Sequence, residues 1–218
     1  MATKVINIQE KQIELLNELY RSFDFFNKHF ALNQLKRPLI TIQTDRSHKT
    51  YGWFGKNFWG ENSKKEANID ELNLTAETLH RQPEEVLETL LHEMAHLKNA
   101  QAGIKDCTVT QYHNKSFKES AEGFGLKVGT MVRKGWAYTQ LDDAAKEAIT
   151  QLKPNKSAYC ICRKPEVRIK KAPTTIPLYV SLDYQDKIDF LLDHFDGKKE
   201  MTEAAVDLLF NNIKLKNK

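Results

Sequence analysis

Two histidines spaced four residues apart enclose a glutamate in the segment His92-Glu93-Met94-Ala95-His96. On an α-helix, residues at this spacing project from one face, so His92 and His96 can present two imidazoles to one metal ion. Glu93 follows the first histidine, where it can take a proton from a zinc-activated water and return it to a leaving amine. The segment therefore predicts one catalytic Zn²⁺ and peptide-bond hydrolysis, with Glu93 as general acid and base. The competing interpretation is a polar surface helix in which the pattern arises by chance.

A catalytic zinc ion needs a third protein ligand and an open coordination position. His113 lies 17 residues after His96, beyond a loop long enough to turn the chain back. Glu119 and Glu122, in a helix expected further along, are the alternatives. Ala102 stands where a metzincin would have its third histidine, which excludes that class. We take His113 as the third ligand.

The chain around the two histidines has the features of an amphipathic helix. Pro83 opens it and two glutamates follow, where a missing N–H costs little and the helix dipole favours negative charge. Gly103 is the expected end. Six apolar residues form the expected buried stripe: Val86, Leu87, Leu90, Leu91, Met94 and Leu97. The histidines therefore fall inside a helix that packs one face on the core.

Strand-like and helix-like patterns occur together along the rest of the chain. Strands are expected at residues 38–44, 51–54 and 68–75, and helices at 9–30, 116–128, 142–152 and within 184–216. The mixture predicts an α+β domain, with a small mixed or antiparallel sheet packed on the metal-binding helix, and a helical C-terminal appendage. We expect three segments: a catalytic domain at 1–150, a basic linker at 151–173 and a helical tail at 174–218.

The composition suits a globular protein and argues against several other classes. The chain has 218 residues and 40% hydrophobic content, enough for a substantial core. No run approaches the roughly 18 apolar residues that span a bilayer, and Met1–Glu10 carries no secretory signal, so we expect a cytoplasmic protein without membrane contacts. Cys107, Cys160 and Cys162 are too few for a disulfide framework, which fits a reducing compartment.

Several motifs, in their order along the chain, resemble those of the SprT-like (Spartan-type) family of zinc metallopeptidases. They are a strand with Gly52-Trp53-Phe54, a strand just ahead of the metal helix, the segment from Leu90 to His96, and His113-Asn114-Lys115-Ser116-Phe117. The resemblance covers roughly residues 10–130. Family members usually have glycine after the third histidine, where this chain has Asn114.

The resemblance implies a zincin-like metallopeptidase domain with His92, His96 and His113 as zinc ligands and Glu93 as general acid and base. It also implies a link to DNA, because the family includes a protease that degrades proteins crosslinked to DNA. Family chains often continue into a zinc ribbon with two cysteine pairs. Here Cys160 and Cys162 form a C-x-C without a second pair, so we expect a degenerate ribbon and no structural zinc there.

The net charge of +4 arises in one short stretch of the chain. Residues 151–173 carry 7 lysines and arginines against 1 acid, whereas residues 1–150 carry 20 of each. The cations are Lys153, Lys156, Arg163, Lys164, Arg168, Lys170 and Lys171. With Tyr159 between them, they could follow a phosphate backbone and stack a base, which makes DNA a candidate partner. The alternative is a solvated linker that is basic only by composition.

Two strands are expected near the substrate cleft. Trp53 is a candidate for substrate or nucleic-acid binding, although a strand aromatic is more often part of the core. The strand at 68–75 is expected to line the cleft and to offer an exposed edge to an extended peptide.

The favoured hypothesis is a zinc endopeptidase that acts on protein substrates, including DNA-associated or DNA-crosslinked ones. Two alternatives stay open at this point. One is a DNA-binding accessory protein in which zinc is structural and four protein ligands close the site. The other is a regulatory peptidase that cleaves a single repressor-like partner.

Overall fold

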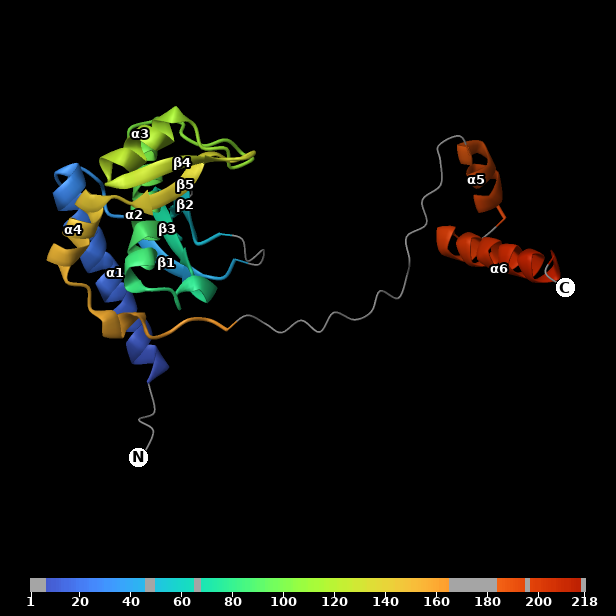
Figure 1. Cartoon of the computed structure of the whole chain (residues 1–218), viewed down its shortest axis with the longest axis horizontal. Helices are drawn as coiled ribbons and strands as arrows, with labels where there is room; N and C mark the ends of the chain where they lie inside the picture. Colours follow the sequence, from blue (N-terminus) through green and yellow to red (C-terminus); the bar gives the residue numbers. More distant parts are fainter. Residues whose placement is uncertain (1–6, 46–49, 65–67, 165–183, 195–196, 217–218) are drawn as a thin grey trace. The chain divides into compact units, whose positions relative to one another are not determined.

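The computed structural model describes residues 7–45, 50–64, 68–164, 184–194 and 197–216 (Figure 1). The chain forms two compact units, Met1–Glu166 and Val167–Lys218, which are described separately below. The first contains the histidine-rich helix and every strand among the described residues. Its mixture of helices and small sheets confirms the predicted α+β class.

A long N-terminal helix, α1 (Ile8–Ala31), supplies one wall of the core. The side chain of Asn7 caps it by accepting hydrogen bonds from the backbone N–H groups of Gln9 and Glu10. One face of the helix is fully buried through Leu15, Leu19, Phe23 and Phe26. These positions recur at helical spacing, so the apolar stripe of the sequence becomes the packed face.

Three strands form a mixed sheet in the order β1-β3-β2. They are β1 (Leu39–Gln43), β2 (Gly52–Trp59) and β3 (Ile69–Thr75). β3 pairs in parallel with β1 and antiparallel with β2, so both of its edges are occupied. The expectation that the strand at 68–75 offers a free edge is therefore wrong. Its residues Glu71–Thr75 are all buried because the strand lies in the centre of the sheet.

The histidine-rich helix is α2 (Pro83–Gln101), which follows a single 3₁₀ turn, η1 (Ala76–Thr78). It packs on β2, β3 and α3. Pro83 occupies its first turn, and Gln82 and Glu85 form a capping box. All six residues of the expected apolar stripe are buried. The helix is thus held on several sides, which fixes the direction of its histidines.

The chain after α2 forms a short helix and a β-hairpin. They are α3 (Lys115–Gly123), β4 (Leu126–Met131) and β5 (Gly135–Leu141). The expectation of a helix at 116–128 is wrong beyond Gly123. Gly125 has a φ of +75° and lies against Ala145, so the chain turns there and enters the hairpin.

Helix α4 (Asp143–Leu152) and a 3₁₀ turn, η2 (Lys156–Tyr159), complete the first unit. Both lie against α1. The backbone N–H of Asn155 donates to Glu18, Tyr159 is buried, and the N–H of Arg163 donates to the carbonyl of Ala76. Residues 151–164 are thus packed on the unit instead of leaving it. The predicted boundary at 173 lies outside the described residues and stays a prediction.

The second unit contains α5 (Gln185–Leu192) and α6 (Lys198–Lys216), where helical spacing was expected. No side chain within residues 184–194 and 197–209 is buried. Among the helices of the described residues, none is long and apolar enough to cross a membrane.

Candidate metal centre

The structure brings His92, His96 and His113 together. His92 and His96 project from the same face of α2, while His113 comes from the loop that precedes α3. One ring nitrogen from each lies within 4.8 Å of the other two. Among the described residues, these three form the one group of histidine, cysteine and acidic side chains that is close enough to hold a metal ion.

The ring of Phe117 packs against all three imidazoles. Its ring centroid lies 4.7 Å from that of His92 and 4.5 Å from those of His96 and His113. The side chain is fully buried and comes from the first turn of α3. Asn114 caps that turn by accepting hydrogen bonds from the N–H groups of Ser116 and Phe117. Asn114, the residue after His113, therefore caps the helix that carries Phe117.

A buried polar chain fixes the orientation of His96. Its Nδ1–H donates to Oδ2 of Asp106 at 2.9 Å, because an ionised carboxylate can only accept. The amide of Asn99 donates to the same oxygen at 2.9 Å, and Ser120 donates to Asn99 at 2.7 Å. Asp106, Asn99 and Ser120 are all buried. Asp106 was missed in the sequence analysis. A single acidic residue in the loop between His96 and His113 was the only sign of it in the sequence.

Backbone contacts hold His113 in place. Its N–H donates to the carbonyl of Lys134, and its own carbonyl accepts from the N–H of Trp136. The Nδ1–H of the ring donates to the carbonyl of Gln111 at 3.2 Å. Gly135 permits this close approach, since a Cβ there would lie 2.2 Å from the His113 carbonyl oxygen. The β4–β5 hairpin therefore positions the third histidine.

The facing nitrogens of His96 and His113 are the feature most specific to a metal site. Their Nε2 atoms lie 3.2 Å apart, and both rings use Nδ1 to donate elsewhere. If both rings are neutral, both Nε2 atoms then carry lone pairs that point at each other, an arrangement that a cation between them would stabilise. Two nitrogens bound to one tetrahedral zinc ion at about 2.0–2.1 Å lie roughly 3.3 Å apart. The observed separation fits that ion.

His92 completes the set from the side of β5. Its Nδ1 lies 3.2 Å from the hydroxyl oxygen of Thr139. A donated proton in this contact leaves Nε2 free as a ligand, as in the other two rings. Each of the three imidazoles thus has a partner on its outer nitrogen: Asp106 and Gln111 come from the loop between α2 and α3, and Thr139 comes from β5.

The electrostatic surroundings favour neutral imidazoles. Burial lowers the pKa of His92 well below its ordinary value, and the neighbouring His96 and His113 lower it further. Burial, together with His96, lowers the pKa of His113 to about 4. Neutral imidazole is the form that binds a metal ion, so His92 and His113 have the protonation state that ligation requires at neutral pH.

Glu93 lies beside the histidines and is buried, with 5% of its surface exposed. Burial raises the pKa of its carboxyl to about 7, against the smaller effect of His96. A Cβ on Gly52 would lie 3.2 Å from Oε1 of Glu93, which places the carboxylate against the start of β2. A carboxyl with this pKa can both accept and return a proton near neutral pH.

The alternative third ligands lie elsewhere. Glu119 and Glu122 are exposed on α3 and pair with Lys115 and Lys118, both at 3.6 Å. Neither carboxylate belongs to the group formed by the histidines. The structure thus places His113 at the cluster and the two glutamates away from it.

No known family, curated protein or solved structure matches this chain. The likeness to SprT-like peptidases therefore rests on the motifs and stays a prediction. What the cluster can do follows from its own donor atoms and their partners.

Of the residues predicted to bind nucleic acid, the structure describes Trp53, Lys153, Lys156, Arg163 and Lys164. Lys156 pairs with Glu84 at 3.4 Å, and Arg163 pairs with the buried Glu77 at 2.9 Å. Lys153 and Lys164 are exposed. Arg168, Lys170 and Lys171 lie outside the described residues. Two of the four described cations therefore neutralise acids of the protein itself.

Trp53 lies on β2 opposite Asn73 of β3 and is half-buried. Trp53 therefore directly follows Gly52, the residue that lies against the Glu93 carboxylate.

Cys107, Cys160 and Cys162 are free thiols.

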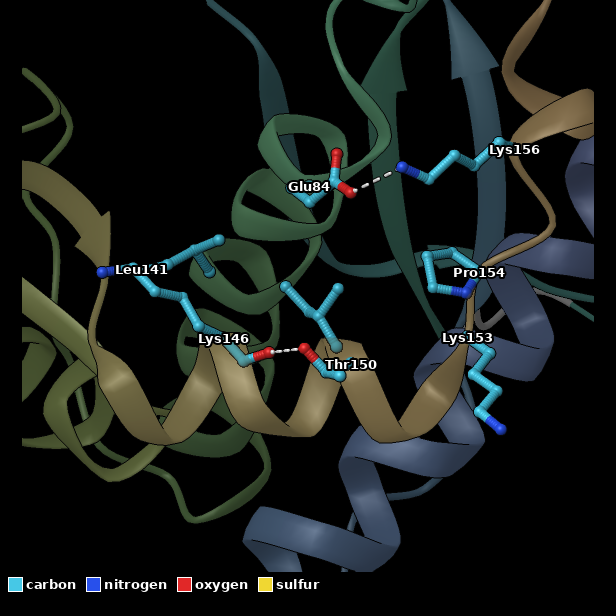
Figure 2. A pocket seen from close by; sticks show the side chains of 8 residues that line it. Glu84, Leu141, Lys146, Thr150, Lys153, Pro154 and Lys156 are labelled. Atoms are coloured by element: carbon cyan, nitrogen blue, oxygen red, sulfur yellow. Dashed lines mark hydrogen bonds and ion pairs between the residues drawn. The ribbon is translucent and has the colours of Figure 1, made fainter.

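A separate cavity of about 500 Å³ lies between α4, the first turn of α2 and the chain that follows α4 (Figure 2). Leu141, Ile149 and Pro154 form part of its lining. Three lysines also reach it, but Lys146 pairs with Asp143 and Lys156 with Glu84. The amino groups of Lys153 and Lys156 point in different directions (Figure 2). The cations do not converge, so the cavity lacks the geometry of an anion site.

Proposed function

We propose that this protein is a zinc-dependent endopeptidase with a zincin-like domain, which hydrolyses peptide bonds in polypeptide substrates. The observation that carries the proposal is the 3.2 Å approach of the Nε2 atoms of His96 and His113, with both Nδ1 atoms engaged elsewhere. His92 would be the third ligand. Three protein ligands are the number found in catalytic zinc sites, whereas structural sites use four.

A zinc ion held by these histidines would supply a water acidified to a pKa of about 7 and a Lewis acid for the substrate carbonyl. Glu93 takes the proton of the attacking water on a carboxylate oxygen and returns it to the leaving amine. In the metal-free protein burial raises its pKa to about 7, and a carboxyl of this kind can accept and return a proton near neutral pH. Burial keeps bulk water from competing for that proton.

The surrounding residues position these groups. Asp106 holds the Nδ1–H of His96 and so fixes the tautomer that leaves Nε2 free. Gly52 lets β2 approach the Glu93 carboxylate, since any larger residue would meet it. In the described part of the basic stretch, Lys156 and Arg163 pair with acids of the protein itself. This part of the stretch therefore does not favour nucleic acid as a partner. Polypeptide is therefore the substrate class that we propose.

Purified protein and its Glu93→Gln variant test the catalytic role. Both should bind one equivalent of zinc, because the substitution leaves all three imidazoles intact. The variant should cleave unfolded protein substrates at least about 100-fold more slowly, because general acid–base catalysis typically contributes that much. Full activity of Glu93→Gln would overturn the proposal.

The third ligand is tested by zinc stoichiometry. His113→Ala should lose tight zinc binding, whereas Glu119→Gln and Glu122→Gln should keep it. The two glutamine variants are matched controls, since they remove the alternative ligands without disturbing the cluster. Retention of zinc by His113→Ala with loss in either control would reverse the assignment.

A further inference from the structure

Two turns lie next to each other at the edge of the metal centre. One is the loop at 108–112 that precedes His113, and the other is the β4–β5 turn at 131–134. In Figure 1 both project from the same side of the first unit. Each turn carries a valine at its tip, Val109 and Val132.

The two turns are joined to each other and to His113. The N–H of His113 donates to the carbonyl of Lys134, and Nζ of Lys134 donates to Oε1 of Gln111 at 2.8 Å. The ring of Tyr112 lies against Gly135, where a Cβ would meet Cζ at 2.9 Å. The turns and the third histidine thus form one connected structure.

Apolar side chains of these two turns are exposed to solvent. Val109 is 100% exposed and Val132 is 91% exposed, and the side chains of Tyr112 and Met131 are about half-exposed. A turn tip normally carries polar residues or glycine, and valine is disfavoured there because it is β-branched. Neither valine packs on the core. Their presence at both tips is therefore unexplained by the fold.

The same structure carries positive charge without matching acids. Arg133 and Lys134 directly follow Val132 in the chain, and Lys105 precedes Val109 by four residues. None of the three forms an ion pair with another described residue. Asp106 is buried against His96 and faces inward. The apolar-basic rim is defined by these seven residues: Lys105, Val109, Tyr112, Met131, Val132, Arg133 and Lys134.

We propose that the apolar-basic rim is a specificity site that binds the substrate polypeptide next to the scissile bond. It would select segments in which apolar side chains stand next to aspartate or glutamate. This inference rests on the proposed function, because the rim is hydrogen-bonded to His113, the third ligand in that function. The rim residues bind side chains and take no part in bond cleavage.

Polypeptide fits the rim better than nucleic acid does. A phosphate backbone would satisfy Lys105, Arg133 and Lys134 but would leave both valines against polar surface. An extended peptide offers apolar and acidic side chains together and so matches both features. The valines are therefore the residues that distinguish the two partners.

Binding and cleavage of two short fluorescent peptides test the rim. One peptide has leucine and valine flanked by aspartate and glutamate, and the other has serine and lysine at those positions. The Glu93→Gln protein, loaded with zinc, reports binding by anisotropy, while the wild type reports cleavage. Val109→Ser combined with Val132→Ser should weaken binding of the apolar-acidic peptide by about tenfold and raise KM, with kcat unchanged.

Ile13→Ser is the matched control, because Ile13 is an exposed branched residue of α1 outside the rim. It should leave binding and KM unchanged. Arg133→Glu combined with Lys134→Glu should abolish the preference for the acidic peptide. An unchanged affinity in the double-serine variant would overturn the proposal, as would equal binding of the two peptides by the Glu93→Gln protein.

The two proposals fail in different ways. Rim-dependent binding by the Glu93→Gln protein without any cleavage by the wild type would contradict the peptidase function and leave the rim established as a peptide site. Cleavage that ignores the valines would contradict the rim alone. Salt-sensitive binding of duplex DNA that is lost in the glutamate variants and kept in the serine variants would identify nucleic acid as the occupant.

Discussion

The Nδ1 atom of His96 lies 2.9 Å from Oδ2 of Asp106, and both side chains are buried. Asn99 and Ser120 extend this contact into the protein, so the carboxylate cannot rotate away. The pair fixes which nitrogen of His96 faces His113. Asp106, which lies outside the segment His92–His96, thus fixes the ring orientation of one of its histidines.

Asp106→Asn should lower zinc affinity about 10- to 100-fold, the usual effect of removing a carboxylate behind a ligating histidine. The side chain keeps its size, so the fold should be retained. Competition with a chromophoric chelator measures the affinity, and circular dichroism checks the fold. Asp143→Asn, at an exposed acid on α4, is the control. Equal affinity in Asp106→Asn and wild type would show that the pair does not orient the ligand.

The stability of the metal-free protein should depend on pH through Glu93. Burial raises the pKa of this carboxyl from its ordinary value of 4.5 to about 7 in the folded protein. Between these values the unfolded chain has released the proton while the folded protein keeps it, so stability falls as pH rises through this window. Below 4.5 both states hold the proton and the effect vanishes.

Glu93→Gln isolates this contribution, because the buried histidines are common to both proteins. The free energy of unfolding of the variant, relative to that of wild type, should increase by about 3 kcal/mol from pH 4.5 to neutral pH. Urea unfolding in the presence of a chelator measures the difference at both pH values. A constant difference across the window would mean that Glu93 ionises as an ordinary carboxyl.

Gly52→Ala should destabilise the protein by about 1–3 kcal/mol, because overpacking forces the backbone to move. An added Cβ would meet the carbonyl oxygen of Asn73 at 2.6 Å and Oε1 of Glu93 at 3.2 Å. Backbone atoms of the central strand cannot yield easily, so Glu93 should also be displaced and activity reduced.

Gly123→Ala is the matched control. An added Cβ there meets nothing closer than Nζ of Lys98 at 3.8 Å, and the residue ends α3. Its stability in urea should be equal to or above that of wild type, since alanine favours the helix. If both alanine variants were equally stable, the close approach at Gly52 would carry no energetic constraint.

Arg163→Gln should reduce stability by about 1–2 kcal/mol, because it leaves a buried carboxylate without its charged partner. Glu77 is 8% exposed; its Oε1 accepts from Arg163 and from the hydroxyl of Thr44, and its Oε2 has no hydrogen-bond partner among the described residues. Lys164→Gln, at the adjacent exposed cation, should change stability by less than about 0.5 kcal/mol. Denaturant unfolding of both variants distinguishes the structural role of Arg163 from that of the exposed Lys164.

Local sequence patterns predicted most elements of the first unit. The helix at 9–30 is confirmed as α1, the helix that starts at Pro83 as α2, and the strand at 38–44 as β1. Caps and apolar spacing act over a few residues, so they can be read without knowledge of the fold. The helix expected at 116–128 is wrong at its end, because the turn at Gly125 depends on contact with Ala145 of α4.

By itself the sequence determined that His92 and His96 share a helix face beside Glu93, because four-residue spacing sets that geometry within one helix. Only the tertiary structure decided that His113, Asp106, Thr139 and Gly52 surround this face. These residues come from loops and strands that meet α2 through long-range packing. The local spacing of residues carries no information about these long-range contacts, so the donor set of the candidate metal centre exists only once the chain is folded.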